Sequence, residues 1–135
     1  LGQSELLVVH AWRMYGESMI RGRGGFSIEE VESLRRETQD AHRQQLIEFL
    51  QQHAFKDLKH QVFLLQGEAG AVITELAQVK AVDLIVMGTV SRSGIAGLLI
   101  GNTAEKILQQ VDCSILTVKP KGFITPVKLD PAQIR

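Results

Sequence analysis

The chain has 135 residues, which is the length of one compact domain. Fifteen basic residues balance fifteen acidic ones, so bulk charge argues against a protein that coats nucleic acid or lies on a membrane surface. The longest apolar run, residues 95–100, is far too short to cross a bilayer, and the first residues lack the pattern of a signal peptide. We therefore expect a soluble, cytoplasmic protein.

Cysteine and histidine suggest no special chemistry. The single cysteine, Cys113, cannot form an internal disulfide, which agrees with a reducing compartment, and no basic cluster beside it would activate a thiolate. The histidines at positions 10, 42, 53 and 60 lack a metal-ligand spacing with one another or with Cys113. The sequence therefore predicts a small buried thiol and no metal site.

The first element is an apolar strand at residues 5–11, and its unbroken Leu-Leu-Val-Val indicates a strand covered on both faces. Residues 12–26 are predicted to form a loop with a cationic, glycine-rich core at residues 21–25. We favour a plain excursion of the chain there. Contact with nucleic acid and closure over an anionic ligand are the alternatives.

A long helix follows this loop. Ser27 and Glu30 form a capping box, and apolar positions predict a helix that continues to about His53. The middle of this helix, residues 35–45, is strongly polar. We interpret that stretch as a solvated face without a binding role.

The rest of the chain alternates strands with helices. Such alternation predicts parallel strands joined by right-handed crossovers in a helix-sheet-helix sandwich. Gly67 ends the second strand, and a tail broken by proline begins at Gly122. The expected strands are residues 61–65, 83–87 and 114–118, and the expected helices are residues 69–79 and 103–111.

The connection between the third strand and the last helix has the outline of an anion site. The strand ends at Met87 and Gly88, glycines recur at positions 94, 97 and 101, and Asn102 with Glu105 predicts a helix capped by Asn102. Free amides and the positive end of a helix dipole favour phosphate at such a place. A plain turn is the alternative, because the spacing fits neither the dinucleotide fingerprint nor a Walker loop.

The fold class constrains where a nucleotide would lie. Ligands of such sheets bind at the carboxyl ends of strands, where the strand order reverses. Ala11 and Gly88 both lie at such ends. If their strands flank the reversal, the base lies near Ala11 and the phosphates reach the loop that runs from Gly88 to Thr103.

These residues resemble the universal stress protein family. The carrying segment is Val-Met-Gly-Thr-Val-Ser-Arg-Ser-Gly-Ile-Ala-Gly-Leu-Leu-Ile-Gly-Asn-Thr-Ala-Glu at residues 86–105, supported by Cys-Ser-Ile-Leu-Thr-Val-Lys-Pro at residues 113–120. The match covers residues 1–120 in element order and is specific from Asp83 onward. Within the family, the chain looks most like the second half of the tandem universal stress protein E type, as judged by residues 88–90, 101–105 and 125–130.

The resemblance implies an α/β fold, a Rossmann-like three-layer sandwich around a parallel sheet of order 3-2-1-4-5. Residues 1–120 would form one universal stress protein domain, and residues 121–135 a C-terminal tail. The family's first strand and helix have no counterpart here, so we expect a gap between the strands at residues 5–11 and 83–87. A longer polypeptide or a partner would fill it.

The resemblance also implies a ligand, ATP or another adenine nucleotide, with Mg²⁺ as a companion of the nucleotide. Ala11 and Met87 would touch the base. The residues expected around the phosphates are Gly88, Ser91, Arg92, Gly101, Asn102 and Thr103. Ser91 and Asn102 depart from the family signature, which has Gly at the first position and Ser or Thr at the second.

The resemblance further implies a function in stress tolerance, through nucleotide binding and through dimer or tandem-domain contacts. The alternative is an interaction module with a degenerate phosphate loop, in which the last strand pairs with a second copy or a sister universal stress domain. Membrane and nucleic acid are not expected partners. Catalysis has little support, because no base or carboxylate cluster stands near the glycine loop, although slow ATP hydrolysis stays an alternative.

Overall fold

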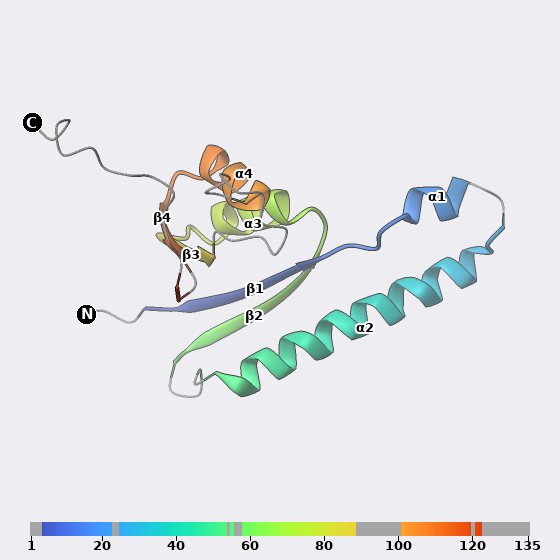
Figure 1. Cartoon of the computed structure of the whole chain (residues 1–135), viewed down its shortest axis with the longest axis horizontal. Helices are drawn as coiled ribbons and strands as arrows, with labels where there is room; N and C mark the ends of the chain where they lie inside the picture. The colour runs from blue at the N-terminus through green and yellow to red at the C-terminus, as the bar shows by residue number, and fades with distance from the viewer. Residues whose placement is uncertain are drawn as a thin grey trace, which may run out of the picture. The chain divides into compact units, whose positions relative to one another are not determined.

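The computed structural model describes residues 4–22, 25–53, 55, 58–88, 101–119 and 121–122. The chain divides into two compact units, Leu1–Ile73 and Thr74–Arg135. Strands and helices alternate along it (Figure 1). The elements are β1 (Leu6–Trp12), α1 (Glu17–Gly22), α2 (Ile28–Gln52), β2 (His60–Gln66), α3 (Ala69–Val79), β3 (Leu84–Gly88), α4 (Asn102–Gln110) and β4 (Ser114–Val118).

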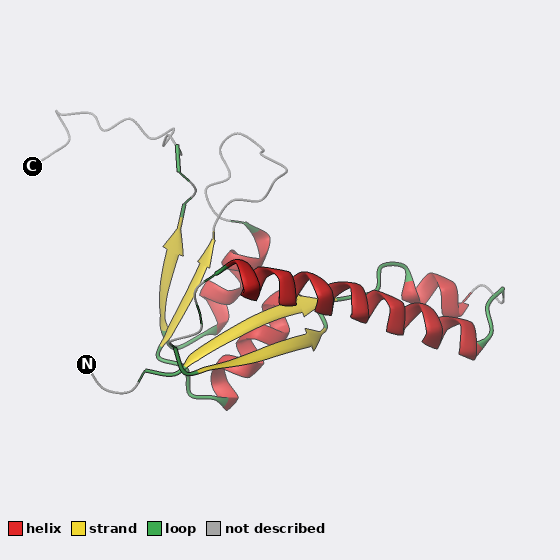
Figure 2. Ribbon diagram, turned by 90° about the horizontal axis from the view of Figure 1, so that it is seen from below, coloured by secondary structure: helices red, strands yellow, loops and turns green. Residues whose placement is uncertain are grey.

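The first unit contains one parallel ladder with a long helix against it. β1 pairs with β2 in parallel, from Leu6 opposite His60 to Trp12 opposite Gln66 (Figure 2). α2 contacts β1 and continues beyond the carboxyl ends of the two strands, where the short helix α1 lies beside it. Among the described residues of this unit, the buried apolar side chains lie at the end of β1, just after it and on α2, and they are Trp12, Met14, Val31 and Leu46.

The prediction that residues 12–26 form a loop is wrong in part. Trp12 is the last residue of β1, and α1 occupies Glu17–Gly22. Gly16 takes a φ of 77°, and its carbonyl accepts the amides of Met19 and Ile20 at 3.0 and 2.9 Å. This short helix begins at the turn that Gly16 forms. Its six residues are too few for a helical repeat of apolar positions to be recognised in the sequence.

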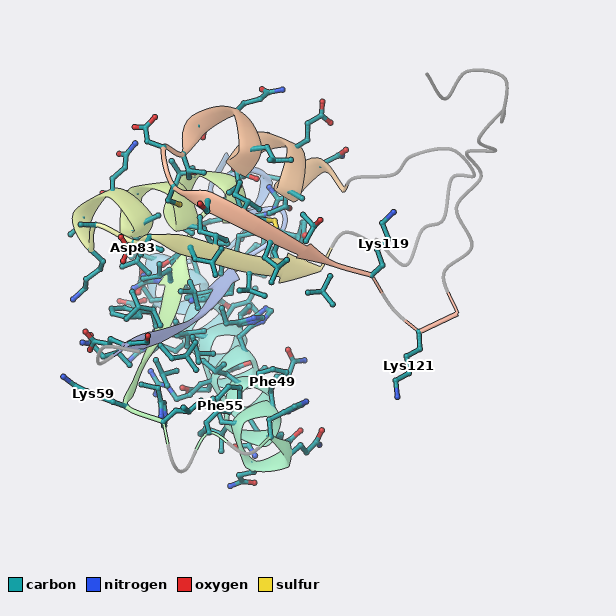
Figure 3. The ribbon with its side chains drawn as sticks, turned by 90° about the vertical axis from the view of Figure 1, so that its left-hand side faces the viewer. Phe49, Phe55, Lys59, Asp83, Lys119 and Lys121 are labelled. Carbon is teal, nitrogen blue, oxygen red and sulfur yellow. The ribbon has the colours of Figure 1, made fainter. Side chains whose placement is uncertain are left out.

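The capping box predicted for α2 is confirmed. The Glu30 amide donates to Ser27 Oγ at 3.1 Å, and the Ser27 amide donates to the Glu30 carboxylate at 2.7 Å. At the other end His53 is the C-cap, and its Nδ1 donates to the Phe49 carbonyl at 2.8 Å. The Phe49 ring lies 6.0 Å from that of Phe55, so aromatic side chains close this end of the helix (Figure 3).

The second unit contains the other ladder. β3 pairs with β4 in parallel, from Leu84 opposite Ser114 to Gly88 opposite Val118 (Figure 2). Its buried residues lie on the two helices, at Thr74 and Ala77 of α3 and at Ala104 and Ile107 of α4. One face of the ladder keeps exposed apolar side chains, namely Leu84, Val86, Leu116 and Val118.

The parallel pairing and the alternation of strands with helices confirm the predicted α/β class. Within the described residues the strands form two ladders, β1 with β2 and β3 with β4. None of the helices described has both the length and the apolar character that a membrane crossing requires.

Candidate functional site

The strand side of the predicted phosphate site is the carboxyl end of β3. Met87 is half-buried opposite Thr117, and Gly88 is exposed opposite Val118. A side chain at Gly88 would meet the Val118 carbonyl oxygen at 3.9 Å, an ordinary contact distance. The backbone at the end of β3 is therefore accessible.

The helix side begins one residue earlier than predicted. Gly101 is the N-cap of α4, with an extended backbone at φ −72° and ψ 153°, and its carbonyl accepts the Glu105 amide at 3.0 Å. The prediction that Asn102 caps this helix is wrong, because Gly101 holds the N-cap position and Asn102 is already the first helical residue. Asn102 and Thr103 are both exposed.

The N-terminus of α4 differs from that of α2 in its hydrogen bonds. In α2 the Ser27 hydroxyl accepts a first-turn amide, whereas the part of the chain that the structure describes gives α4 no side-chain cap. The first amides of any helix lack an acceptor within the helix. In α4 these amides, at the positive end of a nine-residue helix, can therefore donate to an external anion.

The structure brings some of the predicted residues into one unit and leaves others apart. Ala11 belongs to the first unit, where it is half-buried in β1 opposite Leu65. Ser91 and Arg92 lie outside the described residues. The residues that share the second unit and flank residues 89–100 are Met87, Gly88, Gly101, Asn102 and Thr103.

A pocket of about 500 Å³ lies at the other end of the same unit. Its lining comes from the last turn of α3, from residues 81–83 that lead into β3 and from residues 111–114 at the start of β4, and it includes Asp83, Asp112 and Cys113. Two carboxylates near the carbonyl ends of two helices do not suit phosphate. The pocket is therefore separate from the predicted nucleotide site.

Sequence reasoning missed a polar cluster in the first unit. His42 of α2 lies against His10 and Trp12 of β1, with ring centroids 5.1 and 6.0 Å apart. The interpretation of residues 35–45 as a solvated face is therefore wrong at His42, which is half-buried. Its spacing was a usable signal, since Val31, His42 and Leu46 recur at whole helical turns and so share one face of α2.

Comparison with known proteins decides the family. Residues 3–119 match the model of the Universal stress protein family. The chain belongs to the universal stress protein family. The resemblance inferred from residues 83–120 is thereby confirmed.

Individual relatives agree with this assignment. The chain is similar to universal stress protein E of Escherichia coli strain K12, with 42% identity over 65 residues, which are 48% of this chain and 21% of that protein. It is also similar to universal stress protein MJ0531 of Methanocaldococcus jannaschii, with 39% identity over 56 residues, 42% of this chain and 33% of that protein. The matches therefore span a third or less of these relatives.

Solved structures show the same fold. Hypothetical protein MJ0577 superposes with a TM-score of 0.72 at 17% identity, covering 91% of this chain and 81% of that one. PA1789 from Pseudomonas aeruginosa PAO1, described as functionally unknown, gives a TM-score of 0.57 at 27% identity, covering 85% of this chain and 34% of that one. The α/β fold of this chain is therefore shared with solved structures.

Proposed function

We propose that this universal stress protein domain serves stress tolerance by binding an adenine nucleotide, ATP or a relative of it. Its phosphates would lie between the carboxyl end of β3 and the start of α4. The base would approach Met87, as the family resemblance implies. Mg²⁺ would accompany the nucleotide, bound through phosphate oxygens and water.

The observation that carries this proposal is the bare N-terminus of α4. Gly101 holds the N-cap position without a side chain, and among the described residues no side-chain cap accepts the first-turn amides. A phosphate oxygen is an acceptor of the required charge and reach. Gly88 at the end of β3 supports the same position, because its backbone is exposed and carries no side chain.

Asn102, which stands where the family signature has Ser or Thr, is compatible with this ligand. A side chain that capped α4 would compete with phosphate for the same amides, but Asn102 stands one position too late to cap. Its exposed amide group can instead hydrogen-bond a phosphate oxygen. Thr103, also exposed, offers a hydroxyl next to it.

The test is calorimetric titration of ATP with Mg²⁺ into the complete polypeptide, beside a Ser91→Gly/Asn102→Ser variant that restores the family signature. We expect the unmodified chain to bind ATP and the variant to bind it at least as tightly. Gln109→Ser, at an exposed position near the other end of α4, is the matched control and should leave binding unchanged. Failure of both the unmodified chain and the restored variant would refute nucleotide binding.

A second candidate function is an interaction module that uses the last strand. The β3–β4 ladder leaves Val86 60% exposed and Leu116 and Val118 each 51% exposed, which is unusual for apolar side chains of a parallel sheet. A second copy or a sister universal stress domain would pair with β4. Sedimentation of the unmodified chain should then show a dimer that Leu116→Lys weakens, whereas a monomer at every concentration would exclude self-pairing.

A further inference from the structure

Two imidazoles connect the long helix to the sheet of the first unit. His10 Nε2 of β1 and His42 Nδ1 of α2 lie 2.9 Å apart, which is hydrogen-bond distance. The rings are tilted by 39°. One nitrogen must carry a proton and the other a lone pair for this contact to form.

This contact lies where α2 has little apolar attachment. Val31 and Leu46 are the buried residues of the helix, and about four turns separate them, roughly 22 Å along the axis. Between them α2 reaches the strands through polar groups: His42 contacts His10, and Arg35 donates to Gln66 at 3.3 Å. The position of the middle of α2 therefore depends on hydrogen bonds that protonation can change.

The number of protons on the pair determines whether the contact survives. A neutral pair holds one N–H between the rings. A first added proton leaves an imidazolium that still donates to a neutral partner. A second added proton places two N–H groups face to face, with no acceptor and with like charges in contact.

The surroundings of His10 oppose its protonation. Partial burial, and then the positive charge of His42, lower the pKa of His10 below its ordinary value of 6.5. Because the two ring nitrogens lie at hydrogen-bond distance, a proton on one ring affects the proton on the other.

Charged groups on the neighbouring elements do not offset this repulsion. On α2, Glu32 bonds Arg35 at 2.7 Å, and Arg43 lies 3.4 Å from Asp40, whose side chain is 70% exposed. After β1, Arg13 stacks over the Tyr15 ring. On β2, the residues opposite His10 and Trp12 are uncharged, namely Leu64 and Gln66. The described part of the chain gives neither imidazole a carboxylate partner.

We propose that the His10–His42 pair is a proton-operated latch, which holds α2 on the β1–β2 sheet with one or no added proton and releases it when both rings are charged. Opening would expose the indole of Trp12, which lies beside His42 and is now 3% exposed. Its Nε1 is buried and finds no hydrogen-bond partner among the described residues, so hydration of the open state would satisfy that donor. The latch is independent of nucleotide binding and would make this face of the domain responsive to acid.

Trp12 supplies the readout, because it is the single tryptophan of the chain. Its emission and its quenching by acrylamide should be followed in the full chain from about pH 8 to about pH 5, a range that brackets histidine titration. We expect a shift to longer wavelength and stronger quenching as the pH falls, with the pH dependence of about one proton, because release follows only the second protonation. His42→Gln should abolish this transition, because glutamine cannot take the charge.

His53→Gln is the matched control, since His53 is an exposed histidine at the end of the same helix. It should keep the transition of the unmodified chain. A transition that persists unchanged in His42→Gln would overturn the proposal, because acid unfolding by other groups would then explain it. No change in Trp12 exposure across the range would also overturn it.

A measurement without a variant covers the case in which His42→Gln fails to fold. Nitrogen-15 spectra of the imidazoles in the unmodified chain report the protonation of each ring, and amide exchange reports protection of α2. We expect two separate titration steps, with loss of α2 protection in the lower one. Independent titration of the two rings with constant protection of α2 would contradict the latch.

Discussion

Gly67 and Val72 constrain each other at the turn that joins β2 to α3. Gly67 has a φ of 150°, and a Cβ built on it would overlap Val72 Cγ1. Its amide donates to the Trp12 carbonyl at 2.9 Å, so the turn is also tied to the end of β1. The chain can neither rotate away from this conformation nor accept a side chain there without moving the first turn of α3.

We therefore expect Gly67→Ala to lower the free energy of unfolding by about 2 kcal/mol, from backbone strain together with the steric overlap. Urea denaturation followed by circular dichroism measures this loss. Gly16→Ala separates the two causes, because Gly16 also has a positive φ, 77°, but has open space around it. A Gly67→Ala/Val72→Ala double variant should recover part of the loss, and strict additivity of the two single changes would show that the overlap is unimportant.

At the end of α3 we predict the opposite effect, because Ala81 is a position where glycine should be more stable than alanine. It has a φ of 48°, and the Val82 amide donates to the Ala77 carbonyl at 2.9 Å while the Ala81 amide donates to that of Gln78 at 3.1 Å. This is a Schellman motif with alanine at the position that usually holds glycine. Ala81→Gly should raise the free energy of unfolding by roughly 0.5–1 kcal/mol, since relief of strain exceeds the added flexibility of the unfolded chain.

The same urea titration measures the gain at Ala81. Ala71→Gly, at an exposed position inside α3, is the matched control and should lose about 1 kcal/mol. A loss of stability at both positions would mean that the left-handed conformation of Ala81 is not held in solution.

These two turns differ in how far the sequence can predict their backbone conformation. Gly67 follows an apolar run, and glycine is the residue that such a turn requires, so the end of β2 was predictable. Ala81 carries no such signal, because packing imposes a conformation that alanine disfavours. Helix ends are predictable where the residue type matches the geometry, as it does at Ser27 and Glu30.

The candidate site was also predicted only in part from the sequence. The carboxyl end of β3 and the helix that follows were predicted from apolar runs and glycines, but the helix start was misplaced because both Gly101 and Asn102 are good N-cap residues. His42 was missed for a different reason. Its partner His10 is distant in sequence, and a histidine in a polar stretch indicates solvent exposure unless the helical phase is followed.

Ile107 anchors α4 in its unit, with 2% of its surface exposed. Ile107→Ala removes buried methyl groups and leaves a cavity, so we expect the free energy of unfolding to fall by about 3 kcal/mol. Leu108→Ala, next along the helix at 43% exposure, should lose less than about 1 kcal/mol. Equal losses at the two positions, measured by urea denaturation, would contradict the orientation of α4.

Asn102→Asp tests the phosphate position without disturbing the helix. A carboxylate at the first position of α4 interacts well with the helix dipole, so stability should rise by a few tenths of a kcal/mol. The same charge repels phosphate and should weaken ATP binding about tenfold, equivalent to about 1.4 kcal/mol. The two effects therefore have opposite signs.

Calorimetry and thermal unfolding measure this pair of effects on the same samples. Gln109→Glu places the same charge near the other end of α4 and should leave ATP affinity unchanged. Equal weakening by both variants would assign the effect to net charge. Unchanged affinity in Asn102→Asp would place the phosphates away from the start of α4.

The lowered pKa of His10 predicts how stability depends on pH. Burial and the charge of His42 depress this pKa in the folded chain, whereas the unfolded chain binds the proton near 6.5. Between these two values the unfolded state holds more protons, so the free energy of unfolding falls as the pH drops from 6.5 and levels off below the folded pKa. His10→Gln should remove this component, whereas His53→Gln should keep it. Urea denaturation at about pH 7.5 and about pH 5.5 tests the sign, and a slope that is identical in the His10→Gln variant would assign the pH dependence to other groups.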